Sequence, residues 1–298
     1  MASWQQLTLL SHALEAELWE ARLFELGALA VTLRDGKDEP LYEPPLGTTP
    51  LWQTTQVTAL FEADAPLRAQ LDQLALSLAL PEYQIVPLAD QVWERSWMEG
   101  FEPMRFGRRL WIVPSWHTPP PQPEAVNILL DPGIAFGTGT HATTRLCLEW
   151  LDSHAAELSA KHWIDFGCGS GILAIAAAKL GAGHIDAIDI DPQAVAATCR
   201  NRDDNGITPA QLVATCGERV PLGERVDGVI ANILATPLIE FAPQLSAKIR
   251  PGGWLVLSGI LSEQAETVAS AYRSTIDLAP ATELNGWVRI EGRRYLSN

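Results

Sequence analysis

From about residue 123 onwards, apolar runs alternate with helix-like stretches, and this alternation limits the possible folds more than any other feature. The runs lie in the segments HWIDFGCGSG, HIDAIDID, RVDGVIANI and GGWLVLSGIL, and a helix-like segment follows each one. Strands buried on both faces and separated by helices are typical of a parallel sheet with helices on both sides. We therefore predict a doubly wound α/β domain over residues 123–298, with the C-terminal segment GWVRIEGRRYL as an edge strand.

The first 90 residues have a different pattern. Short strands and two helical segments, SHALEAELWEARLFELGA and APLRAQLDQLALSLAL, predict the order β-α-β-β-α-β of a small ferredoxin-like α+β domain. In the first helix, Ser11 is the expected start signal. The expected buried face of this helix consists of Leu14, Leu18, Leu23 and Leu26. Residues 91–122, rich in Trp, Pro and Arg, are expected to form a linker between the two domains.

Charge narrows the class of partner. The chain has a net charge of −15, and its first 90 residues hold 13 acidic and 4 basic side chains. An acidic chain is repelled by a phosphate backbone, so we expect no direct nucleic-acid partner. An acidic N-terminal domain instead favours a basic partner, although acidity that serves only solubility is the alternative.

The sequence contains no run of 18 or more apolar residues, so we expect no membrane span. The first 17 residues lack the basic and apolar regions of a signal peptide, and we expect a cytoplasmic protein. The four cysteines have no paired spacing, which argues against a disulfide framework and against a zinc site. We therefore expect no bound metal.

The turn DFGCGSG lies between a predicted strand and a predicted helix and contains Gly167, Gly169 and Gly171. Glycine lets a ligand approach the backbone closely, and a helix N-terminus adds backbone N–H donors. Asp189 lies 22 residues after Gly167, at the end of the next strand, where an acid binds ribose hydroxyls in nucleoside-binding folds. Asp191 precedes a proline and suits a helix cap, whereas Asp189 has no evident structural task. These residues favour an adenosine-containing cofactor, and a tight turn without a ligand is the alternative.

The segment DGVIANILATP ends an apolar run in Asn232. A buried amide without partners costs about 1–3 kcal/mol, so this position needs an explanation. Asn232 could cap the next helix, but Thr236 followed by Pro237 is a better pair for the cap and the first helical position. At the carboxyl end of a strand, the Asn232 carbonyl can instead accept hydrogen bonds from an amine and aim its lone pair at an electrophile. The Gly/Thr-rich loop before the domain's first helix suits a cofactor lid.

These motifs resemble those of class I S-adenosylmethionine-dependent methyltransferases. The segments DPGIAFGTGTHATTRLCLEWL, ANILATPL and LSGIL, with WMEGFEPMRFGRRLWIVPSW upstream, are similar to the family of bacterial ribosomal protein L11 methyltransferases. The resemblance runs from about residue 92 to the end. It implies a seven-stranded, Rossmann-like catalytic domain over residues 123–298 and a small substrate-recognition domain over residues 1–90, which swings on the linker.

The resemblance also implies an activity and a set of site residues. The activity is methyl transfer to lysine ε-amines and the N-terminal α-amine of ribosomal protein L11, a basic substrate, with up to three methyl groups on each, and we expect a monomer. The candidate contacts for S-adenosylmethionine are Thr144, Gly167, Gly169, Asp189, Asn232 and Phe136. Of these, Asn232 is expected to orient the amine and Thr144 to support it. No general base stands out, with His141 only a loop candidate.

The residues that would hold the adenine amino group are not evident from the sequence. Backbone groups near Cys216 and Gly217 and the side chain of Glu218 are the candidates. Three other classes of protein remain as alternatives. A nucleic-acid amino methyltransferase would carry an aromatic residue after the asparagine, where Ile233 stands, and a nicotinamide-dependent oxidoreductase would have the spacing G-x-G-x-x-G, where Ile172 stands. A binding module without catalytic activity would not need Asn232.

Overall fold

The computed structural model describes residues 2–37, 51–89, 101–131, 141–217 and 223–296. The chain divides into two compact units, Met1–Met98 and Glu99–Asn298. This division falls inside the expected linker of residues 91–122. Residues 104–113 differ from that expectation, because they form two strands that belong to the second unit.

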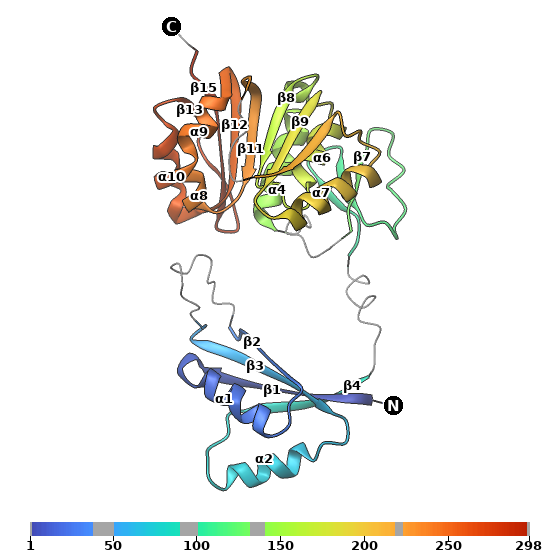
Figure 1. Ribbon diagram of the computed structural model, residues 1–298, viewed down its shortest axis with the longest axis vertical. Coiled ribbons are helices and arrows are strands. Elements are labelled where there is room, and N and C mark those ends of the chain that lie inside the picture. The colour runs from blue at the N-terminus through green and yellow to red at the C-terminus, as the bar shows by residue number, and fades with distance from the viewer. Residues whose placement is uncertain (1, 38–50, 90–100, 132–140, 218–222, 297–298) are drawn as a thin grey trace. The chain divides into compact units, whose positions relative to one another are not determined.

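The first unit is a four-stranded antiparallel sheet with two helices, in the predicted order β-α-β-β-α-β (Figure 1). Its elements are β1 (Ala2–His12), α1 (Ala13–Glu25), β2 (Ala30–Asp35), β3 (Thr54–Glu62), α2 (Leu67–Ala75) and β4 (Tyr83–Ala89). In the sheet the strands lie in the order β2-β3-β1-β4. Strand β1 therefore pairs with β3 on one side and with β4 on the other, although β3 and β4 lie far from it in the sequence.

The core of the first unit shows which face of α1 is buried. The buried residues of α1 are Ala16, Trp19 and Leu23. Leu14 and Leu18 are 89% and 49% exposed, so the expected leucine face was wrong at these two positions. The helix is capped by His12, whose ring accepts a hydrogen bond from the Leu14 backbone, and not by Ser11. Both faces have helical spacing, and the indole of Trp19 buries more apolar surface than a leucine does.

The second unit contains an eight-stranded mixed sheet and a small three-stranded sheet. Its first elements are β5 (Met104–Phe106), β6 (Leu110–Val113), β7 (Val126–Leu129), α4 (Ala142–Ser153), α5 (Ala155–Leu158), β8 (His162–Phe166), α6 (Ile172–Lys179), β9 (His184–Asp189), α7 (Pro192–Asp204) and β10 (Leu212–Cys216). The remaining elements are β11 (Val226–Asn232), α8 (Ala235–Glu240), α9 (Ala242–Lys248), β12 (Ile249–Leu261), the 3₁₀ turn η2 (Ser262–Gln264), α10 (Ala265–Tyr272), β13 (Ile276–Leu278), β14 (Thr282–Leu284) and β15 (Trp287–Arg294).

The large sheet has the strand order β10-β9-β8-β11-β12-β15-β13, and β14 also pairs with β15. Strands β10, β9, β8, β11 and β12 are parallel to one another. Strand β15 lies between β12 and β13 and runs antiparallel to both. The prediction that the C-terminal strand lies at an edge was therefore wrong. The cause is two three-residue strands, β13 and β14, which are too short to give a period in the sequence but which cover the outer side of β15.

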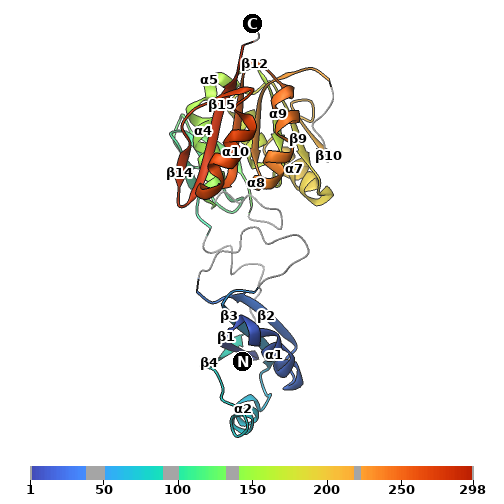
Figure 2. The same cartoon turned by 90° about the vertical axis from the view of Figure 1, so that its left-hand side faces the viewer.

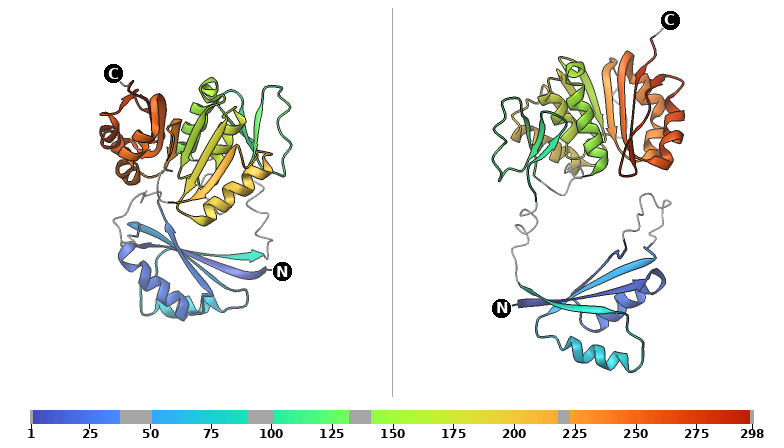
Figure 3. Two further views of the ribbon diagram at one scale, coloured as in Figure 1. Left: turned by 45° about the horizontal axis from the view of Figure 1, so that its top comes forward. Right: turned by 180° about the vertical axis from the view of Figure 1, so that it is seen from behind.

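Helices cover both faces of the large sheet, as predicted for a doubly wound fold. One core, which includes Trp150, Ile175 and Ile185, packs α4 and α6 against the sheet, and α7 contacts β9 and β10 (Figures 1 and 3). The other, which includes Leu245 and Leu257, packs α8, α9 and α10 against the opposite face (Figure 2). No helix within the described part of the chain is long and apolar enough to cross a membrane.

Candidate active site

The order of the parallel strands reverses between β8 and β11, which are neighbours in the sheet although β9 and β10 come between them in the chain. Ligands of open α/β sheets bind at the carboxyl ends of the strands at such a reversal. The glycine turn follows β8, Asp189 ends β9 and Asn232 ends β11. Ile230 lies opposite Asp165 of β8, so Asn232, two residues further on, comes level with Gly167. The fold thus brings these predicted site residues to one edge.

The glycine turn has a backbone that only glycine adopts easily. Gly167, Gly169 and Gly171 have φ values of 77°, 55° and 79°, and Gly171 opens helix α6. Helix α7 holds the turn in place: the Thr198 hydroxyl donates to the Gly169 carbonyl at 3.1 Å, and the Asn201 amide donates to the Ser170 carbonyl at 2.7 Å. The turn is therefore fixed by contacts with the protein itself.

Asp189 has the structural task that the sequence did not reveal. Its Oδ2 accepts a hydrogen bond from the Gly169 backbone at 2.9 Å, and its Oδ1 accepts one from the Asp191 backbone at 3.0 Å. The carboxylate therefore joins the glycine turn to the start of α7, where Asp191 is the predicted cap. Each carboxylate oxygen has a second lone pair, which can accept a hydrogen bond from a ribose hydroxyl.

Asn232 and Thr144 are in contact although 88 positions separate them. The Asn232 amide nitrogen donates to the Thr144 hydroxyl at 3.3 Å, and Thr144, in the first turn of α4, is fully buried. Because the amide nitrogen is engaged in this way, the side-chain carbonyl oxygen is the atom that can accept a hydrogen bond from an amine. Asn232 does not cap α8. That helix has Leu234 at its cap position and begins at Ala235, so the predicted cap at Thr236 was wrong.

The residue after Asn232 is packed between two glycines. A side chain at Gly167 would overlap the Cγ2 methyl of Ile233, and a side chain at Gly259 would overlap its backbone carbonyl. Gly259, in β12, also has a φ of 85°. Gly259 therefore supports the backbone of Asn232 from the neighbouring strand. In the sequence, LSGIL is recognisable only as a family motif, and this role of its glycine is not evident.

Asp165 is a second residue that the sequence analysis missed. It lies in β8 with only 1% of its surface exposed, and its Oδ2 accepts a hydrogen bond from the Ala174 backbone at 3.0 Å. Its Oδ1 is buried and has no hydrogen-bond partner among the described residues. Burial, the largest cause, raises the pKa of Asp165 to about 7; the charge of Asp189 also raises it, and the hydrogen bond from Ala174 lowers it. An acid within the apolar run WIDF was the signal that could have identified it.

These groups fit a nucleoside that carries an amino-acid group. The buried, unpartnered Oδ1 of Asp165 can accept a hydrogen bond from an ammonium group. This hydrogen bond would also offset the free-energy cost of burying the charged carboxylate. Ile190, directly after Asp189, is 70% exposed, and its apolar side chain can pack on a flat base. The Gly217 backbone N–H, an expected adenine contact, instead donates to the Asp189 carbonyl at 2.9 Å. Glu218 and Phe136 lie outside the described residues, as does residue range 132–140 of the expected lid.

Two reactive side chains near this edge take part in packing. His141 caps α4, where its Nδ1 accepts a hydrogen bond from the Thr143 backbone, and its ring packs edge-on against Trp287. Burial lowers its pKa. The Cys168 thiol is buried beside the Thr198 hydroxyl at 3.3 Å, and burial raises its pKa, which keeps it a thiol. Neither group has the position of an evident general base or nucleophile.

Comparison with known proteins identifies the family. The sequence profile of the family described as "Ribosomal protein L11 methyltransferase (PrmA)" matches residues 3–295. The chain belongs to this family. Two relatives named ribosomal protein L11 methyltransferase, from Pseudomonas paraeruginosa and Azotobacter vinelandii, are each 56% identical to it over 293 residues. Each alignment covers 98% of this chain. It covers 98% of the Pseudomonas paraeruginosa relative and 99% of the Azotobacter vinelandii relative.

A solved structure agrees with this assignment. The crystal structure of ribosomal protein L11 methylase from Lactobacillus delbrueckii subsp. bulgaricus has 31% sequence identity and a TM-score of 0.60, and it covers 65% of this chain and 100% of that chain. The predicted resemblance to L11 methyltransferases and the predicted Rossmann-like methyltransferase fold are thus confirmed. The chain belongs among methyltransferases and not among nicotinamide-dependent oxidoreductases.

Proposed function

We propose that this protein transfers methyl groups to the N-terminal α-amine and to lysine ε-amines of ribosomal protein L11. The contact between Asn232 and Thr144 carries the proposal, because it places an amide carbonyl at the edge where the glycine turn and Asp189 lie. Membership of the L11 methyltransferase family and the names of the relatives support the choice of substrate. The name of the family includes methyl transfer, which a binding module would not perform.

The cofactor in this proposal is S-adenosylmethionine, which supplies an electrophilic methyl group on a sulfonium sulfur when it is bound. Asp189 accepts hydrogen bonds from the ribose, and the backbone at Gly167 and Gly169 lies close to the cofactor. The unpartnered Oδ1 of Asp165 accepts a hydrogen bond from the ammonium group. Ile190 packs against the base. Phe136, expected from the resemblance, is a further proposed contact.

The chain's contribution to methyl transfer is mainly positioning. Thr144 holds the Asn232 amide, and the Asn232 carbonyl accepts a hydrogen bond from the substrate amine and so directs the lone pair of its nitrogen. A free lysine has a pKa near 10.4, so the amine must lose a proton before it can react, and transfer from water to a buried site favours its neutral form. We propose that this proton passes to solvent, because His141 caps α4 and is not positioned as a base.

We assign recognition of the substrate to residues 1–90 and catalysis to the second unit. Ribosomal protein L11 is a basic substrate in this proposal, and the first 90 residues carry 13 acidic and 4 basic side chains. Opposite charges accelerate the encounter of two proteins. The protein acts in the cytoplasm as a monomer, without direct contact to nucleic acid. The swing of the first unit on the segment that joins it to the second unit would present different amines to Asn232.

The choice of acceptor is tested by incubation of the purified chain with isotopically labelled S-adenosylmethionine and either ribosomal protein L11 or ribosomal RNA. We expect label on the protein and none on the RNA. Label on the RNA alone would instead support a nucleic-acid methyltransferase. Absence of label from both acceptors, with the cofactor bound, would support a binding module.

A further inference from the structure

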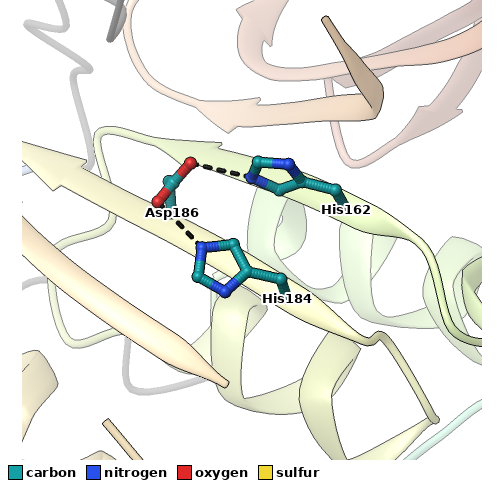
Figure 4. A group of neighbouring side chains, drawn as sticks. All are labelled: His162, His184 and Asp186. Carbon is teal, nitrogen blue, oxygen red and sulfur yellow. Dashed lines mark hydrogen bonds and ion pairs between the residues drawn. The ribbon is translucent and has the colours of Figure 1, made fainter. Parts of the chain in front are cut away.

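Two histidines and an aspartate form a cluster at the amino-terminal ends of β8 and β9. The His162 Nε2 lies 2.8 Å from Asp186 Oδ2, and the His184 Nε2 lies 3.2 Å from Asp186 Oδ1 (Figure 4). The ligand atoms of all three side chains lie within 4.8 Å of one another, and all three are half-buried. We call these three residues the His–His–Asp cluster.

Strand register assembles this cluster. His162 begins β8 and pairs with His184, which begins β9, and Asp186 lies two residues further along β9 on the same face of the sheet. The glycine turn starts after Phe166, at the opposite end of β8, four residues or about 13 Å from His162. The cluster is therefore separate from the candidate active site.

The hydrogen bonds of His184 fix the state of its ring. The Ala210 carbonyl oxygen lies 2.9 Å from the His184 Nδ1, and a carbonyl accepts only, so Nδ1 carries the hydrogen. The Nε2 of the neutral ring then presents a lone pair to the Asp186 carboxylate. Two acceptors facing each other at 3.2 Å require a cation between them, either a proton or a metal ion. Such a backbone carbonyl is also the usual outer partner of a metal-binding histidine.

We propose that the His–His–Asp cluster binds one divalent transition-metal ion of the zinc type. Two imidazole nitrogens and a carboxylate suit Zn²⁺, Co²⁺ and Ni²⁺, whereas Mg²⁺ and Ca²⁺ prefer oxygen ligands alone. Zinc–nitrogen bonds of about 2.0–2.1 Å need ligand atoms roughly 3.3 Å apart in a tetrahedron, and the distances of 2.8 and 3.2 Å between the imidazole nitrogens and the carboxylate oxygens are close to that spacing. The positive charge of Lys161, next to His162 in the sequence, is paired with Glu157 at 3.1 Å.

The bound ion links the beginnings of two adjacent strands and takes no part in methyl transfer. Because it binds the folded chain, it raises the stability of the second unit by mass action. The expectation of no bound metal rested on the spacing of the cysteines, and this cluster contains no cysteine. This site goes beyond the proposed function, and its test does not depend on methylation.

The test uses the full chain, freed of metal with a chelator and kept reduced. Zinc affinity is measured by calorimetry and thermal melting, and Co²⁺ is added as a spectroscopic probe of imidazole ligation. The variants are His184→Gln and Asp186→Asn, and melting in chelator identifies a variant whose fold is intact. His117→Gln is the matched control, because His117 lies 3.9 Å from a single carboxylate, that of Glu102. Cys216→Ser controls for the exposed thiol.

We expect the wild-type chain to bind one Zn²⁺ per molecule and to melt at a higher temperature with Zn²⁺ than in chelator. Each cluster variant should weaken zinc binding by about a hundredfold or more, since a lost outer partner alone costs 10- to 100-fold. Both controls should bind zinc as the wild type does. The proposal would be overturned if the wild type bound no zinc at a millimolar zinc concentration, or if both cluster variants bound zinc as the wild type does. The cation between His184 and Asp186 would then be a proton.

Discussion

At the scale of single residues, the backbone of Asn232 depends on its neighbour Ile233. Ile233 packs against two positions, Gly167 and Gly259, at which any side chain would overlap it. Gly167 therefore has a packing role in addition to its proposed role near the cofactor. Gly259 has no proposed contact with the cofactor, so its substitution tests the support of Asn232 separately.

The variant Gly259→Ala is expected to lower turnover through a displaced Asn232. A left-handed backbone costs an alanine about 1–2 kcal/mol, and the new methyl group also overlaps the Ile233 carbonyl. Gly286→Ala is the matched control, since Gly286 has a φ of 78° and its added methyl group would meet no atom within 4 Å. Melting temperatures should fall in both variants, and further in Gly259→Ala because of the overlap, whereas the methylation rate should fall only in Gly259→Ala. Equal turnover in the two would contradict the supporting role.

Asp165 gives a prediction about pH. Its pKa is about 7 in the free protein, above the usual value of 3.8, so the carboxyl gains its charge as the pH rises through 7. If the ionised form accepts a hydrogen bond from the cofactor's ammonium group, the affinity for S-adenosylhomocysteine should rise with pH and level off above 7. Asp165→Asn should weaken binding by about 10- to 100-fold at pH 8 and remove the pH dependence. Calorimetry between pH 5.5 and 8.5 checks this, and an unchanged pH profile in the variant would refute it.

The sequence predicts residues at the ends of strands better than residues within them. The glycine turn, Asp189 and Asn232 are polar or flexible residues after apolar runs, so the ends of the strands mark them. Asp165 lies inside an apolar run, so its position does not mark it in the same way, although an acid in a buried strand itself indicates a functional residue. The contact of Asn232 with Thr144 follows from the resemblance and not from spacing, because 88 residues separate them.

At the scale of elements, local patterns predicted the order of helices and strands but not every pairing. Strand β6 pairs with β5 and with β7, and β15 lies inside the large sheet, because pairing depends on segments that are distant or very short. The same limit applies to the face of a helix. In α1 two sets of apolar residues have helical spacing, and only the packing against the sheet decides that Trp19 is buried and Leu14 is not.

This difference in α1 predicts unequal effects of two truncations. Trp19→Ala should destabilise the first unit by about 3–5 kcal/mol, because it leaves a cavity in the core. Leu14→Ala should change its stability by no more than about 0.5 kcal/mol, because Leu14 is exposed. Urea denaturation of residues 1–98, followed by circular dichroism, measures both. If Leu14→Ala lowered the free energy of unfolding more than Trp19→Ala does, the buried face of α1 would be the leucine face expected from the sequence.

At the scale of the whole molecule, the chain has two units with separate cores. Among the described residues, one buried cluster lies in the first unit and two lie in the second. All residues that we propose to bind the cofactor belong to the second unit, which begins at Glu99. The acidic excess of the first 90 residues belongs to the other unit. The two activities, cofactor binding and substrate recognition, should therefore be separable.

A chain of residues 99–298 is expected to bind S-adenosylhomocysteine with the affinity of the full chain and to lose methylation of ribosomal protein L11. Its own core keeps the cofactor edge folded, whereas the acidic unit that attracts the substrate is gone. Calorimetry measures the affinity, and transfer of label to the protein measures the methylation. Efficient methylation by the shortened chain would show that residues 1–90 do not recognise the substrate.

The most direct measurement for the whole account compares the affinity for S-adenosylhomocysteine with the rate of L11 methylation in Asn232→Ala. We expect turnover to fall about a hundredfold, as positioning of the amine is lost. Affinity should change less than about tenfold, as for the loss of one hydrogen bond. Asn285→Gly, at an exposed turn with a φ of 52°, is the control and should change neither. Equal losses of affinity and turnover in Asn232→Ala would contradict its role in orienting the amine.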